Sequence, residues 1–173
     1  RPAVGTDTGS RQVSEVSILD QSDRLLSEYM GLLRDKMGDR MDDYAIPPPV
    51  FEAMKAKFVA LELESGTLST RFPVLESYLN PYGTMQGGMV AAAIDNTLGP
   101  LSVLIAPPNV TRRLELKYSH PVTMNMGHII VHARLLESKE QWLYFRADVH
   151  SQEGTRLALA KATHWIIGEE GAD

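Results

Sequence analysis

The spacing of hydrophobic residues changes along the chain from a helical period to a strand period. From about residue 20 to residue 41, apolar side chains recur at three- and four-residue steps, and charged residues fill the other face. This spacing predicts an amphipathic helix that docks on another part of the protein, with Asp20 or Ser22 as its N-cap. The apolar stripe consists of Leu26, Tyr29, Met30, Leu33, Met37 and Met41.

The segments around this helix carry weaker signals. Residues 1–17 are polar and contain glycine, so we expect them to be flexible. Three consecutive prolines at residues 47–49 form a stiff connector. A short helix is expected from Val50 to about Lys57.

Beyond residue 57, apolar and polar residues alternate with the period of two that is typical of strands. The expected strands cover about residues 59–64, 68–72, 113–119, 128–135, 142–150 and 156–167. Short turns between the last three of them predict an antiparallel meander. On the last strand Ala158, Ala160 and Ala162 share one face, so a large element can pack closely there.

Between the second and third expected strands lies an apolar segment, residues 84–106, that is long enough to cross a membrane. Asp95 near its centre argues against a span, because a central Asp costs about 2.5–3.5 kcal/mol there. Three glycines and Pro100 argue the same way, so we expect a helix in the core of a soluble domain. The helix is apolar nearly all round, and a sheet can cover only one side of it. A second subunit is therefore expected on the other side.

These elements predict one α+β domain, in which an antiparallel sheet of about six strands wraps around one long central helix. We expect an N-terminal helical extension at residues 1–57, the domain itself at residues 58–167 and a tail at residues 168–173. The extension is expected to pack on the domain or to cover a tunnel in it.

Composition narrows the classes of function. The formal net charge of −5 lacks the basic footprint of a nucleic-acid binder. The absence of cysteine excludes disulfides, Cys-ligated metals and a thiol nucleophile, and it agrees with a cytoplasmic location. His128 and His132 would sit about 13 Å apart on a strand, so we expect no shared metal. Other residues read as structural are His120, His150, His164, Trp142 and Trp165.

The stretch NPYGTMQGGMVAAAIDN, residues 80–96, carries the chemistry. Asp95 either bonds a neighbouring backbone group, Asn96 or Thr97, or acts as a general base or nucleophile in a desolvated pocket. The first N–H groups of a helix have no intrahelical acceptors, and glycine lets a ligand approach them closely. The N–H of Gly87 could therefore hold the oxyanion of an acyl-transfer intermediate. The amide of Asn80 completes a coherent hydrolytic set.

The motif N-P-x-G-T-x-x-G-G, with an Asp eight residues after the first glycine of its Gly-Gly pair, resembles the hotdog-fold acyl-CoA thioesterases of the PaaI-like, phenylacetate-pathway branch. The strand LELKYSHPV, residues 114–122, resembles the third sheet strand of that family. The resemblance covers about residues 58–167.

The resemblance implies roles for several residues. Asp95 matches the carboxylate that activates water or attacks the thioester, and Gly87 matches the glycine whose N–H polarises the thioester carbonyl. Asn80 matches a residue that positions the reacting groups, and Thr111 falls near the attacking water. In the family, Asp95 of one subunit would face Asn80 and Gly87 of another. A homodimer or tetramer follows, with coenzyme A entering only as part of the substrate and no other cofactor or metal.

One position departs from the family pattern, because Gln86 stands where relatives keep histidine. Gln86 can brace the turn beside Gly88 at the substrate site but cannot carry a proton. Activity survives if the histidine mainly holds geometry. If the histidine takes part in the chemistry, the protein is slow or only binds. Arg112 and Arg113 could contact the phosphates of coenzyme A, or else form a solvated strand end or a dimer salt bridge.

Three functions are therefore weighed. The first is an acyl-CoA thioesterase acting on acyl or aryl-acyl thioesters. The second is a non-catalytic acyl-CoA or acyl-ligand binding protein on the same scaffold. A dehydratase or hydratase ranks last, because that chemistry usually needs a His with the carboxylate and no His accompanies Asp95 in its helix.

Overall fold

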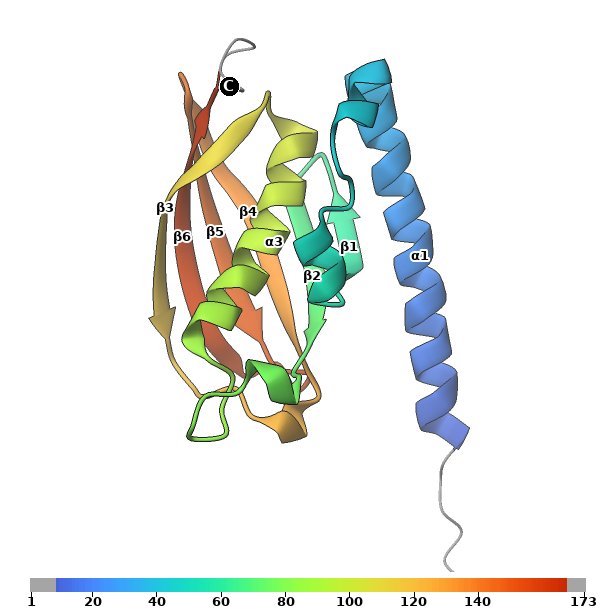
Figure 1. The fold of residues 1–173 in the computed structure, drawn as a ribbon, viewed down its shortest axis with the longest axis vertical. Coiled ribbons are helices and arrows are strands. Elements are labelled where there is room, and N and C mark those ends of the chain that lie inside the picture. The colour runs from blue at the N-terminus through green and yellow to red at the C-terminus, as the bar shows by residue number, and fades with distance from the viewer. Residues whose placement is uncertain (1–8, 168–173) are drawn as a thin grey trace, which may run out of the picture.

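Six antiparallel strands form one sheet in the order β1-β2-β4-β5-β6-β3. The computed structural model describes residues 9–167, and its ribbon shows one long helix lying across the sheet (Figure 1). Strands β4, β5 and β6 are neighbours joined by short turns, so the predicted meander is confirmed. The strands are β1 (Lys57–Glu62), β2 (Thr67–Pro73), β3 (Asn109–Tyr118), β4 (His128–Lys139), β5 (Trp142–His150) and β6 (Arg156–Ile166).

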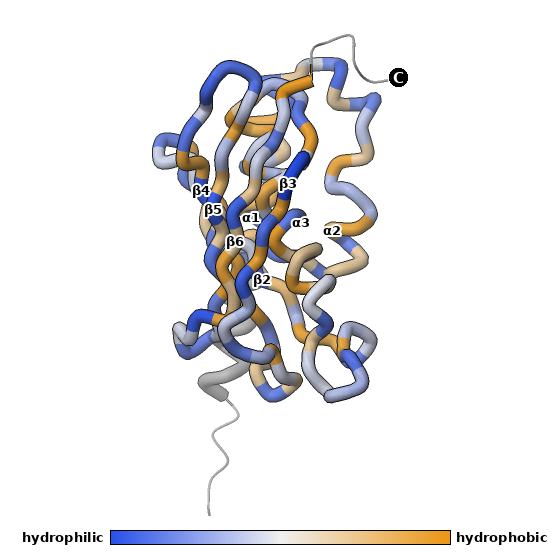
Figure 2. The backbone as a smooth tube through the Cα atoms, turned by 90° about the vertical axis from the view of Figure 1, so that its left-hand side faces the viewer, coloured by the Kyte–Doolittle hydropathy of each residue, from blue (hydrophilic) through white to orange (hydrophobic). Residues whose placement is uncertain are grey.

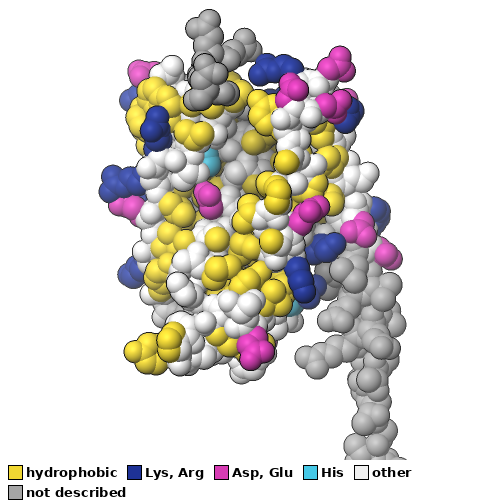
Figure 3. Space-filling view, viewed as in Figure 1, with side chains coloured by type: hydrophobic (Ala, Val, Ile, Leu, Met, Phe, Trp, Pro, Cys, Tyr) yellow, Lys and Arg dark blue, Asp and Glu magenta, His cyan; other side chains and the backbone are white. Residues whose placement is uncertain are grey.

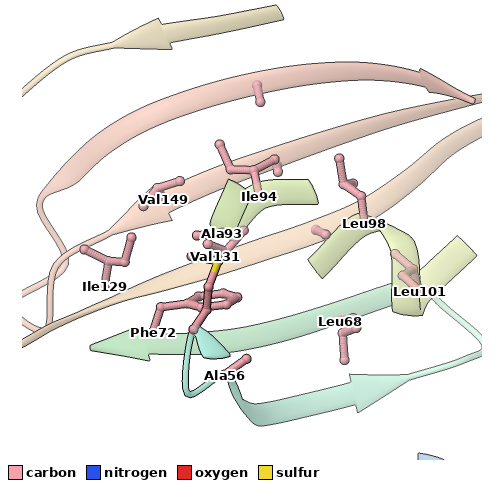
Figure 4. Close-up of a cluster of buried hydrophobic side chains, with 14 of the residues drawn as sticks. Ala56, Leu68, Phe72, Ala93, Ile94, Leu98, Leu101, Ile129, Val131 and Val149 are labelled. Carbon is pink, nitrogen blue, oxygen red and sulfur yellow. The ribbon is translucent and has the colours of Figure 1, made fainter. Parts of the chain in front are cut away.

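The alternation along the strands places one set of side chains in the core. Hydrophilic and hydrophobic residues alternate along much of the sheet (Figure 2), and β5 repeats half-buried and buried positions over its whole length. The three alanines of β6 predicted to share a packed face are all buried. Figure 4 shows Ile94 and Leu98 of the helix pointing toward the strands that carry Val131 and Val149.

Helix α3 (Gly87–Ile105) is the predicted central helix and begins at the Gly-Gly pair. By length and composition alone it could cross a membrane, yet one of its faces packs on the sheet. That buried face comprises Val90, Ala93, Ile94, Thr97, Leu98, Leu101 and Ser102. Its other face carries half-buried apolar residues such as Met89, Val103 and Leu104, and apolar side chains are visible on this side of the molecule (Figure 3). The predicted α+β fold is confirmed.

The first helix of the N-terminal extension begins and ends earlier than predicted. Helix α1 (Gly9–Met37) includes residues 9–17, which were expected to be flexible, while residues 1–8 lie outside the described part. The helix ends before residue 41 because Gly38 has a φ of 59°, a left-handed conformation that stops helices. A 3-10 helix, η1 (Gly38–Asp43), continues and keeps Met41 buried. The remaining short helices are α2 (Pro49–Ala53), η2 (Glu76–Tyr78) and η3 (Met124–Met126).

Helix α1 packs on β1 and on α3. Its apolar stripe supplies the contact, since Tyr29 and Leu33 are buried. Lys36, near the end of α1, donates hydrogen bonds to the carbonyl oxygens of Val103, Leu104 and Ala106 at distances of 2.5–3.1 Å. These carbonyls lie at the C-terminus of α3, where intrahelical donors run out and the helix dipole is negative. The extension therefore caps the central helix as well as covering part of it.

Replacing Lys36 with methionine is expected to lower the free energy of unfolding by about 1 kcal/mol, because the carbonyl oxygens at the C-terminus of α3 would lose a charged donor. Methionine retains the apolar stem, so the loss reports the cap. Chemical denaturation measures it, with Lys161→Met at an exposed position of β6 as the control. Equal stabilities of the two variants would contradict a capping role.

Candidate functional site

Four polar side chains from three elements form a continuous chain beside the second half of α3. The Thr111 hydroxyl lies 2.9 Å from Oδ1 of Asp95 and 3.2 Å from Nε2 of His164. Nδ1 of His164 lies 2.9 Å from Oδ1 of Asn109. The structure thus brings together Asp95 and Thr111, both predicted as site residues, and adds His164 and Asn109, which were not.

A bulge in β3 makes this arrangement possible. Thr111 pairs with His164 and Arg113 pairs with Thr163, so Arg112 is the extra residue of β3. One extra residue reverses the alternation of side chains. Without the bulge Thr111 would lie on the face opposite Leu114; with it, Thr111 turns toward α3.

His164 occupies a core position on β6. The strand period places it on the same face as Ala158, Ala160 and Ala162, and only 1% of it is exposed. Its ring lies 4.8 Å from that of Phe145. Burial lowers the pKa of His164, and the charge of Asp95 partly opposes that shift. The alternating alanines of β6 were the sequence signal that could have predicted a buried position for His164.

Asp95 is exposed in the single chain, so one copy does not by itself form the desolvated pocket expected around this carboxylate. Its helix turns it toward β3 rather than into the sheet, because the core face of α3 is taken by Ile94, Leu98 and their neighbours. The bond that Asp95 accepts from Thr111 differs from the structural alternative, in which Asp95 bonds a neighbouring backbone group, Asn96 or Thr97. Any desolvation of Asp95 must come from a second molecule.

The Gly-Gly pair lies at the N-terminus of α3. Within residues 9–167, the N–H groups of Gly87 and Gly88 have no hydrogen-bond acceptor. The Tyr118 hydroxyl donates to the carbonyl oxygen of Gly87 at 2.8 Å. A Cβ built on Gly87 would lie 3.1 Å from the Tyr118 side chain, a close contact that the tyrosine relieves by shifting a few tenths of an ångström. Two free donors at a helix N-terminus can hold an anionic oxygen.

Asn80 and Gln86 shape the loop before the helix. Oδ1 of Asn80 accepts from the backbone N–H groups of Tyr82 and Thr84, and its amide nitrogen donates to the Thr84 hydroxyl at 2.9 Å. Gln86 is the N-cap residue, yet it braces the turn with its backbone, whose N–H donates to Tyr78, and its side chain forms no cap. Asn80 therefore fixes the turn that presents Gly87.

The two arginines after Thr111 are exposed. Arg112 is the bulge residue, and Arg113 pairs with Glu115 on the same strand. Neither arrangement tests the expected contact with coenzyme A.

The remaining histidines and tryptophans lie apart from the polar chain. His132 bonds the Ser69 hydroxyl at 2.8 Å, and His128 bonds Gln152 at 2.7 Å. His120 bonds the carbonyl oxygen of Arg156. Trp142 and Trp165 pack edge to face with ring centroids 4.4 Å apart. Among the described residues, no group of three His, Asp or Glu side chains could hold a metal ion.

The glycine donors and the carboxylate are separated within one chain. Gly87 and Asp95 are eight residues apart on one helix, which corresponds to about 12 Å along its axis. Strand β3 runs beside α3 in the opposite sense, with Tyr118 at the Gly87 end and Thr111 at the Asp95 end. A single chain therefore keeps these two groups of residues apart, one at the N-terminus of α3 and the other near its middle. We refer to them as half-sites.

Each half-site adjoins a cavity. One, of 350 Å³, lies at Gly87 and Tyr118 and includes His120. The other, of 430 Å³, lies between the N-terminal extension and α3 and reaches Asn96 and Asn109. The second is lined mainly by apolar residues of both elements, among them Tyr29, Met37, Ile46, Gly99, Pro100 and Val103.

Solved structures of other proteins share the fold of this chain. No protein-family model and no curated protein matches the chain. A candidate thioesterase of Ralstonia eutropha, related to phenylacetic acid degradation, is 26% identical; the match covers 78% of this chain and 98% of that one with a TM-score of 0.67.

Two further solved structures share the fold. PaaI of the Escherichia coli phenylacetic acid degradation operon is 14% identical, with 79% and 94% of the two chains covered and a TM-score of 0.65. A Streptococcus mutans protein bound to acetyl CoA is 21% identical, with 64% and 87% covered and a TM-score of 0.59. The chain is a hotdog-fold protein similar to the PaaI-like thioesterases.

Proposed function

We propose that this protein hydrolyses the thioester of an acyl- or aryl-acyl-CoA at a site shared between two copies of the chain. The observation that carries the proposal is the pair of half-sites: free N–H donors at Gly87 and Gly88, and a carboxylate held by Thr111 about two helical turns away. Coenzyme A is proposed as part of the substrate, supported by the fold shared with a protein bound to acetyl CoA.

A two-fold arrangement unites the half-sites. Strand β3 is at the edge of the sheet, so one of its sides can pair with another chain. Antiparallel pairing of two β3 strands about their middle brings the Thr111 end of one chain to the Tyr118 end of its partner. Asp95 of one copy then approaches the Gly87 donors of the other, and the half-buried face of α3 is covered.

The chemistry follows from the two groups. Asp95 takes a proton from water as the water oxygen attacks the thioester carbonyl. In the alternative route Asp95 attacks that carbon itself, and after the thiolate leaves, water hydrolyses the resulting mixed anhydride to release the free acid and restore the carboxylate. The N–H groups at the start of α3 bind the oxyanion that forms. Collapse of the tetrahedral intermediate breaks the carbon–sulfur bond, and the departing thiolate takes up a proton. Asn80 acts through the turn that it holds.

Release of free thiol from short, medium, long and aromatic acyl-CoA thioesters tests this function. Turnover at ordinary enzyme rates is expected for at least one class. Gln86, standing where relatives keep histidine, favours a second candidate, a non-catalytic acyl-CoA binder. Acyl-CoA binding without hydrolysis across the panel would select that candidate.

The cavity under the extension is proposed to receive the acyl group. It is the more apolar of the two cavities, and its polar end at Asn96 and Asn109 adjoins Asp95 and the bonded His164. Its volume of 430 Å³ lies within the range of small-molecule pockets. The extension, which lies outside the family resemblance, would then set the acyl preference of this chain.

Gly99→Leu is expected to shift the preference toward short acyl groups, raising KM about 10-fold or more for the longest good substrate. A Cβ at Gly99 meets no atom within 4 Å, so the leucine enters the cavity without a backbone clash. Gly31→Leu on exposed α1, with equally open surroundings, is the control. Steady-state kinetics across chain lengths measure the shift, and an unchanged profile in Gly99→Leu would remove the acyl group from this cavity.

A further inference from the structure

We infer that His164 is a positioning residue that holds the proton taken up by Asp95, through the hydroxyl of Thr111. This inference rests on the proposed hydrolysis. It leaves every step of that reaction unchanged and adds a second group that can hold the proton. The histidine expected at position 86 is absent, and His164 supplies a titratable ring from a different element.

The hydrogen-bond inventory defines the state of the ring. The amide nitrogen of Asn109 donates to the carbonyl oxygen of Pro107 at 2.8 Å, which fixes the amide orientation and leaves Oδ1 facing His164. A carbonyl oxygen only accepts, so Nδ1 of His164 carries a proton. Because burial lowers its pKa below the usual value near 6.5, the ring is neutral at pH 7, and Nε2 is an acceptor.

The Thr111 hydroxyl has one proton to donate, and two acceptors lie within hydrogen-bond distance of it. It can donate either to ionised Asp95 or to Nε2 of His164, and never to both. The resting network therefore lacks one proton, and the acceptor left without a donor is nearly inaccessible to water because His164 is 1% exposed. One added proton satisfies every bond.

The added proton can be held at either end of the chain, on Asp95 or on His164. When Asp95 takes it from the attacking water, the carboxylic acid donates to Thr111 Oγ1, and the threonine hydroxyl donates to His164 Nε2. Moving both protons along the chain leaves Asp95 ionised, Thr111 unchanged and His164 positively charged. The departing thiolate is later protonated as the proton returns, so no other reagent is needed.

Within residues 9–167, no charged group other than Asp95 acts on the ring. Strand β5 packs Leu143 and Phe145 against it, and β3 presents Thr111 and Asn109. Among the described residues, the charge of Asp95 on α3 is the one that acts on the pKa of His164, and it raises that pKa against the effect of burial. A proton on the ring is therefore favoured by the neighbouring carboxylate.

His164→Gln tests the relay, because glutamine can keep hydrogen bonds but cannot hold the proton. We expect kcat to fall about 10²-fold, KM to change little, and the acid limb of the kcat/KM profile to move to lower pH. Thr111→Val should give the same loss, and the double variant should be no worse than either single one. His150→Gln, on the neighbouring strand, should leave rate and profile unchanged.

A wild-type rate and profile in His164→Gln would overturn the relay while leaving the hydrolase proposal standing. Nitrogen-15 NMR of the His164 ring tests the relay even without turnover. We expect a neutral ring protonated on Nδ1 at pH 7, and a titration midpoint that Asp95→Asn lowers. A ring protonated on Nε2, or a midpoint unmoved by that substitution, would overturn it. An inactive wild type would overturn the proposed hydrolysis alone.

Discussion

Asp95→Asn is expected to lower kcat/KM for the best acyl-CoA thioester by about 10³-fold. The amide keeps the shape of the carboxylate and can still accept a bond from Thr111 at the distance of 2.9 Å seen here. It cannot take a proton from water or attack the thioester, so the loss reports the chemistry rather than the fold. Thiol release at saturating and limiting substrate measures both kcat and kcat/KM.

Asp148→Asn is a control on a different face of the sheet, where Asp148 accepts two hydrogen bonds from Arg146. It should leave the rate unchanged. Thermal unfolding of both variants checks that neither effect comes from loss of structure. Robust turnover by Asp95→Asn would show that another group activates the water.

Two inactive chains are expected to restore activity when they assemble together. Gly87→Pro removes the backbone N–H at the first helical position, where proline is tolerated, and Gln86 before it already has the extended conformation that proline requires. We expect kcat to fall about 10²-fold or more. Gly87→Ala is the matched control, since it makes the same close contact with Tyr118 but keeps the donor.

A heterodimer of Asp95→Asn with Gly87→Pro should then show about half the wild-type rate per dimer, because one of its two shared sites is intact. Co-expression with two affinity tags isolates it, and each homodimer serves as the inactive reference. A heterodimer as inactive as its parents would place the whole site within one chain. That result would contradict the proposal of a shared site, which rests on the separation of Gly87 and Asp95 by about 12 Å along one helix.

The sequence by itself determined the elements and the chemical groups of the site. Period-two alternation was enough to locate all six strands, and the meander followed from short turns, because both are local properties of the chain. The Gly-Gly pair correctly marked the start of α3, since free N–H groups and close approach depend on neighbouring residues only. The end of α1 was misplaced because the apolar stripe continues through η1 to buried Met41, and the positive φ of Gly38 was not considered.

Only the tertiary structure decided which side chains meet. His164 is 53 residues from Thr111, and their contact depends on strand register and on the bulge at Arg112, neither of which leaves a local signal. The exposure of Asp95 likewise follows from how α3 lies on the sheet. Local periodicity specifies an element and its faces, whereas contacts between distant elements depend on the packing of the whole core. For that reason the proton chain from Asp95 to Asn109 could be found only in the folded molecule.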